Sequence, residues 1–142
     1  MDPWGRFLYV ANFYDGVLSV CRIAGNGNLT PVAGSPFATT PASSIVVVDP
    51  QGRFLYVANS FEPAISVYHI AGNGALTQLP GSPFHVETEP DSMVIDLTGR
   101  FLYLANETGV SAYRIAGNGT FTPLAGSPFV TGFFPTAMAV SP

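Results

Sequence analysis

Short apolar runs separated by turn residues fill the chain, and no long window shows helical spacing of apolar positions. In the middle of the chain, "SSIVVVD" (residues 43–49) is continuously apolar, which is typical of a strand buried on both faces. "RFLYVAN" (residues 53–59) follows the turn "DPQG", and "AISVYHI" (residues 64–70) is rich in β-branched and aromatic residues. After the hairpin turn "AGNG", the stretch "LTQLPGSPF" (residues 76–84) is a weak strand whose Pro and Gly suit a sheet edge. The pattern predicts four antiparallel strands, named a, b, c and d in this order.

This four-strand pattern occurs three times. Its landmarks are "GRFLY" at Gly5, Gly52 and Gly99, "IAGNG" at Ile23, Ile70 and Ile115, and "GSPF" at Gly34, Gly81 and Gly126. The spacing is 47 residues, shortened to 45 for the later landmarks by a deletion between Asn106 and Val110. Such a period lies between those of WD40 and kelch propeller blades. We therefore predict an all-β chain of three four-stranded propeller blades, with repeats at residues 2–48, 49–95 and 96–140.

The repeated motifs also resemble those of a known family. "DPxGRFLYVAN", followed by "SVYxIAGNGxLTxLxGSPF" and a Pro before the next apolar strand, is similar to the lactonase-type seven-bladed propellers. That family includes the 6-phosphogluconolactonase-like and muconate-cyclase-like proteins. The resemblance covers all 142 residues, but it spans three repeats where the family has seven. It implies a propeller fold and raises lactone hydrolysis as one candidate activity.

The phase of the repeats predicts how a ring would close. The first strand, residues 6–10, is of type b, and the last, residues 136–140, is of type a without a following b strand. In a ring of only three blades, the gaps between blades would be too wide for flat four-stranded sheets to fill. Propellers have four to eight blades. Pairing between copies would close the ring, as a six-bladed homodimer or, alternatively, a nine-bladed homotrimer. The expected seam residues are Trp4, Phe7, Leu8, Tyr9, Val10, Ala137, Met138, Ala139 and Val140.

Composition narrows the possible partners. The net charge is −4, and the five basic residues are all Arg, so a basic stripe for nucleic acid is not expected. The apolar runs are too short to span a membrane, and the sequence shows no signal peptide. The single Cys allows no internal disulfide, so the sequence does not indicate whether the cellular compartment is oxidising or reducing.

Polar residues that recur in every repeat are interpreted as structural. Arg6, Arg53 and Arg100 each follow an Asp by four residues, which predicts an Asp–Arg pair or turn brace. Cys21 occupies the position of Tyr68 and Tyr113, and a packed thiol is expected there. The sequence contains no G-x-S-x-G, Walker loop or H-E-x-x-H motif.

The residues that differ between repeats fall in the b-to-c and d-to-a loops, which a meander places on the same face. This predicted mouth is acidic and aromatic. Its expected ligand-binding residues are Tyr14, Asp15, Phe61, Glu62, Asp91, Glu107, Phe133 and Phe134, with Glu87 and Glu89 nearby.

Three functions remain open. The first is a self-assembling propeller module without catalysis. The second is a module that binds a cation or cationic ligand, with Glu87, Glu89 and Asp91 as metal-ligand candidates. The third is a lactone hydrolase, for which His85 with Glu87 or Glu89 is the acid–base candidate. Acidic walls repel phosphorylated sugars, and no cofactor is expected.

Overall fold

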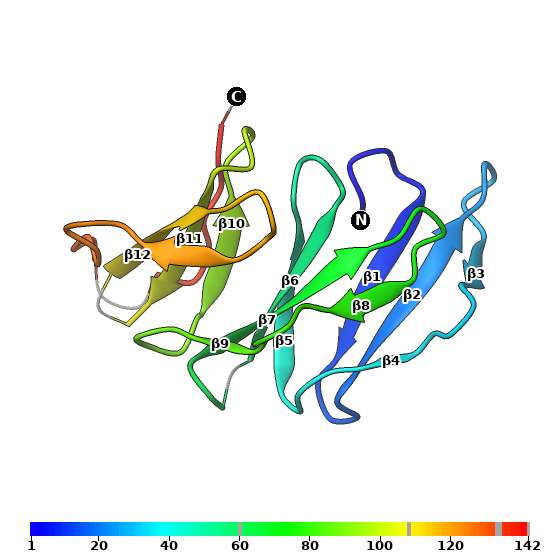
Figure 1. Cartoon of the computed structure of the whole chain (residues 1–142), viewed down its shortest axis with the longest axis horizontal. Helices are drawn as coiled ribbons and strands as arrows, with labels where there is room; N and C mark the ends of the chain where they lie inside the picture. The colour runs from blue at the N-terminus through cyan, green and yellow to red at the C-terminus, as the bar shows by residue number, and fades with distance from the viewer. Residues whose placement is uncertain (60, 108, 133–134, 142) are drawn as a thin grey trace.

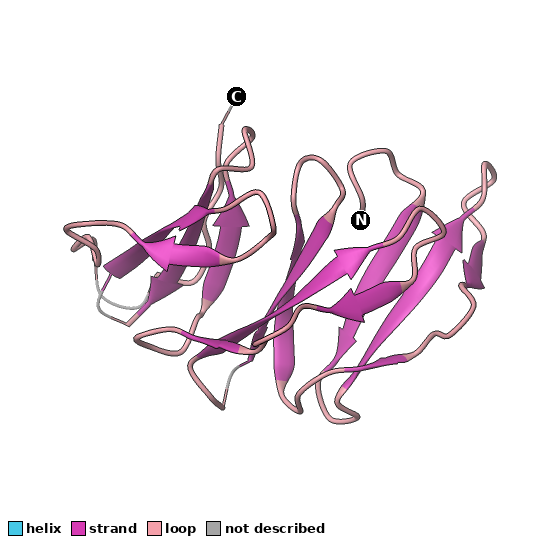
Figure 2. Ribbon diagram, viewed as in Figure 1, coloured by secondary structure: helices cyan, strands magenta, loops and turns pink. Residues whose placement is uncertain are grey.

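The computed structural model describes residues 1–59, 61–107, 109–132 and 135–141, and these residues form strands, turns and loops without a helix (Figure 2). The strands make three separate antiparallel sheets that follow one another along the chain (Figure 1). The all-β propeller architecture expected from the repeats is therefore confirmed. None of the described residues belongs to a helix long and apolar enough to cross a membrane.

Each sheet is one blade, and the strands run through it in chain order. Blade 1 contains β1 (Phe7–Asn12), β2 (Val17–Ile23), β3 (Leu29–Pro31) and β4 (Phe37–Ala38). Blade 2 contains β5 (Ser43–Val48), β6 (Phe54–Asn59), β7 (Ala64–Ile70), β8 (Leu76–Gln78) and β9 (Phe84–His85). Blade 3 contains β10 (Ser92–Ile95), β11 (Phe101–Asn106), β12 (Gly109–Ile115) and β13 (Phe121–Pro123). The strands of types a, b and c in blade 2 are β5, β6 and β7.

The outer strand of each blade differs from the single weak strand that the sequence predicted. In blade 2 it is split into β8 and β9, which both pair with β7. Between them the Ser82 hydroxyl accepts a 2.9 Å hydrogen bond from the Val67 N–H of β7. Ser35 and Ser127 accept equivalent 2.9 Å bonds from Val20 and Ala112. The serine of each "GSPF" motif thus binds a strand-c amide at the point where the outer strand is interrupted.

The core lies between the blades. Apolar side chains on one face of each sheet pack against the facing side of the next sheet, which removes them from water. One cluster joins blades 1 and 2 and contains Phe7, Tyr9, Leu18, Val20, Leu55, Val57, Tyr68, Ile70 and Leu76. The other joins blades 2 and 3 and contains Phe54, Tyr56, Ala58, Ile65, Val67, Val86, Met93, Ile95, Leu102, Leu104 and Tyr113.

The repeated Asp braces the turn that leads into strand b. The buried Asp49 carboxylate accepts hydrogen bonds from the Arg53 and Phe54 amides, at 2.6 and 2.8 Å. The Arg53 Nε lies 3.7 Å from the same carboxylate, and the equivalent Arg6–Asp2 distance is 3.0 Å. The structural role predicted for this repeated pair is confirmed, with the backbone bonds as its main part.

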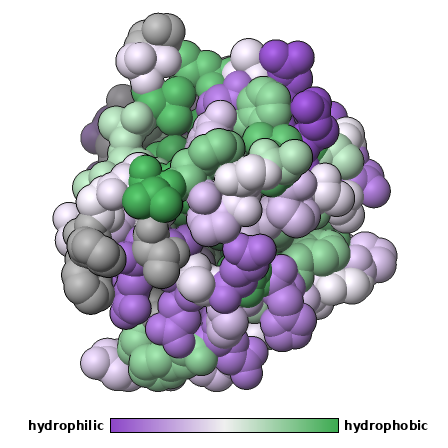
Figure 3. Space-filling view, turned by 90° about the vertical axis from the view of Figure 1, so that its left-hand side faces the viewer, coloured by the Kyte–Doolittle hydropathy of each residue, from purple (hydrophilic) through white to green (hydrophobic). Residues whose placement is uncertain are grey.

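Blades 1 and 3 each leave one face without a neighbouring blade. Val10 of β1 is 40% exposed, whereas Val57 and Leu104, at the same position of blades 2 and 3, are 0% and 1% exposed. On blade 3, Phe101 and Tyr103 are only half-buried. Figure 3 views the blade 3 side and shows apolar surface among polar residues. We call these the open faces of blade 1 and of blade 3.

The two faces of β1 divide the side chains of the expected seam. Phe7 and Tyr9 are buried against blade 2, because alternate side chains of a strand point to opposite sides. Among the expected seam residues of β1, Leu8 and Val10 lie on the opposite face from Phe7 and Tyr9. Trp4 lies over Gly52 of the second repeat, at the boundary between blades 1 and 2. Residues 136–140 form no strand, although the sequence predicted one. A strand is stabilised by a pairing partner, and none of the described strands pairs with this segment.

Candidate functional site

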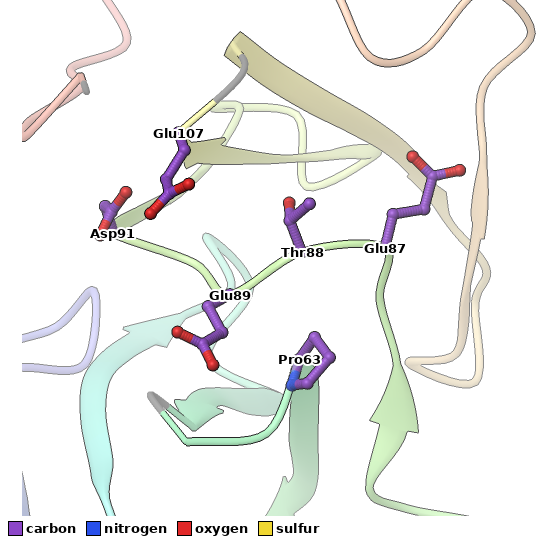
Figure 4. A pocket seen from close by; sticks show the side chains of 6 residues that line it. All are labelled: Pro63, Glu87, Thr88, Glu89, Asp91 and Glu107. Carbon is purple, nitrogen blue, oxygen red and sulfur yellow. The ribbon is translucent and has the colours of Figure 1, made fainter. Parts of the chain in front are cut away.

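The two sets of variable loops meet at one end of the blades, as the sequence predicted. They enclose a cavity of about 330 Å³ between blades 2 and 3. Pro63 and Glu107 come from b-to-c loops, and the other lining residues come from the d-to-a loop between β9 and β10. The lining residues, shown in Figure 4, are Pro63, Glu87, Thr88, Glu89, Asp91 and Glu107. We call this the acidic cavity.

The carboxylates of the acidic cavity are not gathered around one point. Asp91 and Glu107 lie close to each other. Glu89 projects from the side of its loop on which Pro63 lies, and Glu87 extends away from the others (Figure 4). Within the described ranges, no three His, Cys, Asp or Glu side chains are placed to hold a metal ion. The metal-ligand candidates Glu87, Glu89 and Asp91 are therefore brought to one loop without forming a coordination site.

A second cavity of about 260 Å³ lies at the same end, between blades 1 and 2. Its lining residues are Thr40, Pro41, Asn59, Phe61 and Glu62. The Asn59 side-chain oxygen accepts hydrogen bonds from the Thr40 and Ser43 hydroxyls, at 2.6 and 3.0 Å. These bonds tie the d-to-a loop to the end of β6, so Asn59 has a structural role at the edge of this cavity.

Exposed aromatic side chains form part of the rim at this end. The rings of Phe13 and Tyr14 meet edge-on with centroids 5.1 Å apart, and Phe13 and Phe61 do so at 5.6 Å. Tyr14 is 93% exposed and Phe61 is 74% exposed. The aromatic rim predicted for the first two repeats is therefore present. The other two predicted rim residues, Phe133 and Phe134, lie outside the described residues.

The candidate acid–base residues are divided between two cavities. His85 is exposed on β9, where it pairs with Ala64 of β7. It lines a separate cavity of about 310 Å³ at the outer strands, together with Glu87 and Tyr113. Glu89 lines the acidic cavity, and only Glu87 borders both. This division follows from His85 lying on the outermost strand, while Glu89 lies in the loop that returns to the inner strand.

Basic groups are placed away from the acidic cavity. Arg6, Arg53 and Arg100 follow the a-to-b turns, at the opposite end of strand b from the b-to-c loops. No Arg lines either cavity at the mouth among the residues that the structure describes. The described lining of these two cavities therefore offers no Arg to stabilise a developing oxyanion.

The perturbed tyrosines belong to the blade boundaries. Burial, with the nearby Asp2 carboxylate, raises the pKa of Tyr9 to about 12. Burial also raises the pKa of Tyr56, Tyr68 and Tyr113 above the ordinary value. Because these hydroxyls stay neutral, they serve packing and hydrogen bonding rather than acid–base chemistry at the mouth.

Sequence reasoning located the acidic loops but missed Pro63, Thr88 and Thr40. Each lies in a variable loop that had been assigned to the mouth, so position in the repeat was the available signal. Nothing in the residue types singled them out, because Pro and Thr are ordinary loop residues.

Comparison with known proteins agrees with this architecture. A family model described as "Lactonase, 7-bladed beta-propeller" matches residues 31–132. The chain therefore belongs to the lactonase family of seven-bladed β-propellers. No match was found among curated protein sequences.

Several solved structures have the same fold. A candidate 6-phosphogluconolactonase of Bacteroides uniformis is 18% identical, with a TM-score of 0.84 over 100% of this chain and 43% of that one. A candidate 6-phosphogluconolactonase of Bacteroides fragilis is 20% identical, with a TM-score of 0.80 over 96% of this chain and 39% of that one. A periplasmic gluconolactonase of Pseudomonas aeruginosa is 21% identical, with a TM-score of 0.70 over 86% and 38% of the two chains. The chain thus spans about two fifths of the length of these relatives.

Proposed function

We propose that the chain is a propeller module that completes its ring by assembling with a second copy of itself. The observation that carries this proposal is the free edge of β1. The strands β6 and β11 are each paired on both edges, whereas β1 pairs only with β2 among the described strands. An unpaired, apolar strand edge recruits another strand.

The pairing of the equivalent strands in blade 2 indicates which segment would pair with β1, and in which register. In blade 2 the inner strand pairs Val48 with Leu55 and Val46 with Val57. The same positions in the other two repeats are Val140 with Leu8 and Met138 with Val10. Residues 137–140 of one copy would therefore add to β1 of the next as strand a. This addition gives blade 1 the inner strand of type a that it lacks. It also gives residues 136–140 a pairing partner.

The experiment is sedimentation of the 142-residue chain, which measures its mass in solution. Twice the chain mass supports the six-bladed homodimer, and three times the chain mass supports the nine-bladed homotrimer. Deleting residues 136–142 should abolish the closed assembly, and Val10→Lys should weaken it because a lysine blocks edge pairing. Thr30→Lys, on the exposed outer strand β3, is the matched control and should assemble normally.

A monomeric 142-residue chain at high concentration would overturn the proposal. It would mean that the free edge is covered by other blades or remains uncovered. An assembly whose mass is unaffected by the deletion and by Val10→Lys would also contradict strand addition at β1.

Lactone hydrolysis is a second candidate, favoured by the family to which the chain belongs. The names of its structural relatives point to sugar lactones as the substrate class. His85 and Glu87 are the candidate acid–base pair, since they border the same outer cavity. Among the described residues no Arg lines either mouth cavity, which weighs against this activity because no cationic side chain there would stabilise an oxyanion.

A further inference from the structure

The blades of this chain contact one another through an aromatic ring that lies on a glycine. Phe7 of blade 1 lies over Gly74 of blade 2, so closely that a Cβ on the glycine would be 2.7 Å from the ring. Phe54 of blade 2 lies over Gly119 of blade 3 in the same way, at 2.6 Å. Each glycine has a positive φ in the turn between strands c and d, and only a residue without a side chain leaves room for the ring. We call the ring the knob and the glycine the socket.

The third knob and the third socket are both present but are not in contact. Phe101 is the knob position of blade 3, and it is half-buried on the open face. Gly27 is the socket position of blade 1; its φ is +84°, and no atom lies within 4 Å of an added Cβ. The open face of blade 3 thus carries an unused knob, and blade 1 carries an empty socket.

Phe101 has the same two cationic neighbours as Phe7, a knob already docked. The Arg6 and Arg22 guanidinium carbons lie 5.3 and 5.2 Å from the Phe7 ring centre. The Arg100 and Arg114 carbons lie 5.7 and 5.3 Å from the Phe101 ring centre. Two arginines at the same repeat positions therefore contact both rings.

A second row of contacts is interrupted at the same place. Trp4 lies over Gly52, and Gln51 lies over Gly99 while its amide donates a 3.2 Å hydrogen bond to the Thr98 carbonyl. The next members of this row are Thr98 and Gly5, and Gly5 has no atom within 4 Å of an added Cβ. This second row therefore also ends with an uncovered glycine on blade 1.

We infer that Phe101 of one copy docks on Gly27 of a second copy, so that the open face of blade 3 packs on the open face of blade 1. This inference rests on the proposed function and specifies the side-chain contact that joins the copies. The partner is a second copy because both halves of the contact are on this chain and the same contact occurs twice within it. Such a head-to-tail interface closes into a ring when the rotation allows it.

One substitution distinguishes this seam from the boundary between blades 1 and 2. The Tyr68 hydroxyl donates a 3.2 Å hydrogen bond from blade 2 to the Ala38 carbonyl of blade 1. At the seam this position is Cys21, which stands opposite Leu8 just as Tyr68 stands opposite Leu55. A thiol is a weak donor. The seam would therefore lack the counterpart of this hydrogen bond.

The test measures the dissociation constant of the assembly by sedimentation at a series of chain concentrations. Phe101→Ala should weaken each seam by roughly tenfold to a hundredfold, the value of burying one such side chain. Gly27→Asn should weaken it similarly, because Asn tolerates the positive φ but fills the socket. Cys21→Tyr should strengthen it by about tenfold or less, which is the value of one added hydrogen bond.

The control variants carry the same kinds of substitution, Phe→Ala and Gly→Asn, at positions away from the seam. Phe61→Ala removes an exposed aromatic at the mouth, and Gly126→Asn adds a side chain at a glycine of φ +85° in an outer turn. Both should assemble as the parent chain does. Circular dichroism and thermal unfolding of each variant check that the blades are folded.

Mixing the Phe101→Ala and Gly27→Asn chains gives the decisive measurement. Each mixed pair regains one intact contact between the Phe101 of one copy and the Gly27 of the other. The mixture should therefore assemble more strongly than either variant alone. If the parent chain does not assemble, the proposed function fails. If the parent assembles but both variants and their mixture do so equally well, the proposed function stands and this seam is wrong.

Discussion

The Tyr56 hydroxyl donates a 2.9 Å hydrogen bond to the carbonyl oxygen of Gly119, across the boundary between blades 2 and 3. The equivalent hydroxyl of Tyr9, at the boundary between blades 1 and 2, is buried without a hydrogen-bond partner among the described residues. The two boundaries share their apolar packing but differ in this polar contact.

This difference predicts unequal effects of the same substitution. Tyr56→Phe leaves a buried carbonyl without its donor and should lower the free energy of unfolding by about 1 to 2 kcal/mol. Tyr9→Phe removes a hydroxyl that has no partner among the described residues. It should change the free energy of unfolding by less than about 0.5 kcal/mol or stabilise the chain slightly. Urea unfolding of the two variants measures both values. Equal losses would show that Tyr9 also forms a hydrogen bond in solution.

The Asp brace predicts that the carboxylate matters more than its ion pair. Asp49→Ala leaves the Arg53 and Phe54 amides without their acceptor, and should cost about 2 to 4 kcal/mol of unfolding free energy. Arg53→Ala should cost less than about 1 kcal/mol, because half of its side chain is exposed and the pair is solvent-screened. Thermal and urea unfolding compare the two. A larger loss for Arg53→Ala would make the ion pair the main part of the brace.

The buried tyrosines predict loss of stability at alkaline pH. In the unfolded chain a tyrosine ionises near its ordinary pKa of about 10, whereas the pKa of Tyr9 in the fold is raised to about 12. Above pH 10 the unfolded state therefore releases protons first. The contribution of Tyr9 is complete below this pH and is lost as the pH rises toward 12.

Urea unfolding at a series of pH values, combined with tyrosinate absorbance, measures this loss. Tyr9→Phe should make the alkaline dependence less steep, with the remaining slope due to Tyr56, Tyr68 and Tyr113. Tyr14→Phe should leave it unchanged because Tyr14 is 93% exposed. An alkaline dependence that is the same in both variants would exclude Tyr9 as a contributor.

The mouth predicts no turnover of simple sugar lactones above background. Hydrolysis needs a base to activate water and donors for the oxyanion, and His85 lies in a different cavity from Glu89 and Asp91. The assay follows proton release from a sugar lactone with the assembled chain. Hydrolysis that disappears in His85→Ala, with the assembly intact, would establish the lactone hydrolase instead.

Much of the fold was determined by local sequence. The short apolar strands, the "AGNG" turns and the repeated Asp before strand b depend on neighbouring residues, so their pattern could be read along the chain. The placement of the variable loops on one face also followed, because antiparallel strands joined by short turns return every second loop to the same end. The acidic character of the mouth required only that topology and the positions of Glu62, Glu87, Glu89, Asp91 and Glu107.

Other features were decided only by the tertiary structure. Which of Phe7, Leu8, Tyr9 and Val10 face outward depends on which sheet lies on which side, and the alternation alone does not specify it. The separation of His85 from Glu89 depends on the path of the outer strand, where the Ser82 hydroxyl takes over an amide at a break that the sequence did not reveal. The unused knob at Phe101 and the empty socket at Gly27 differ from their repeat counterparts in neither residue type nor local conformation. They differ because a packing contact needs two blades, and each of these residues lies on a face where the second blade is not part of this chain.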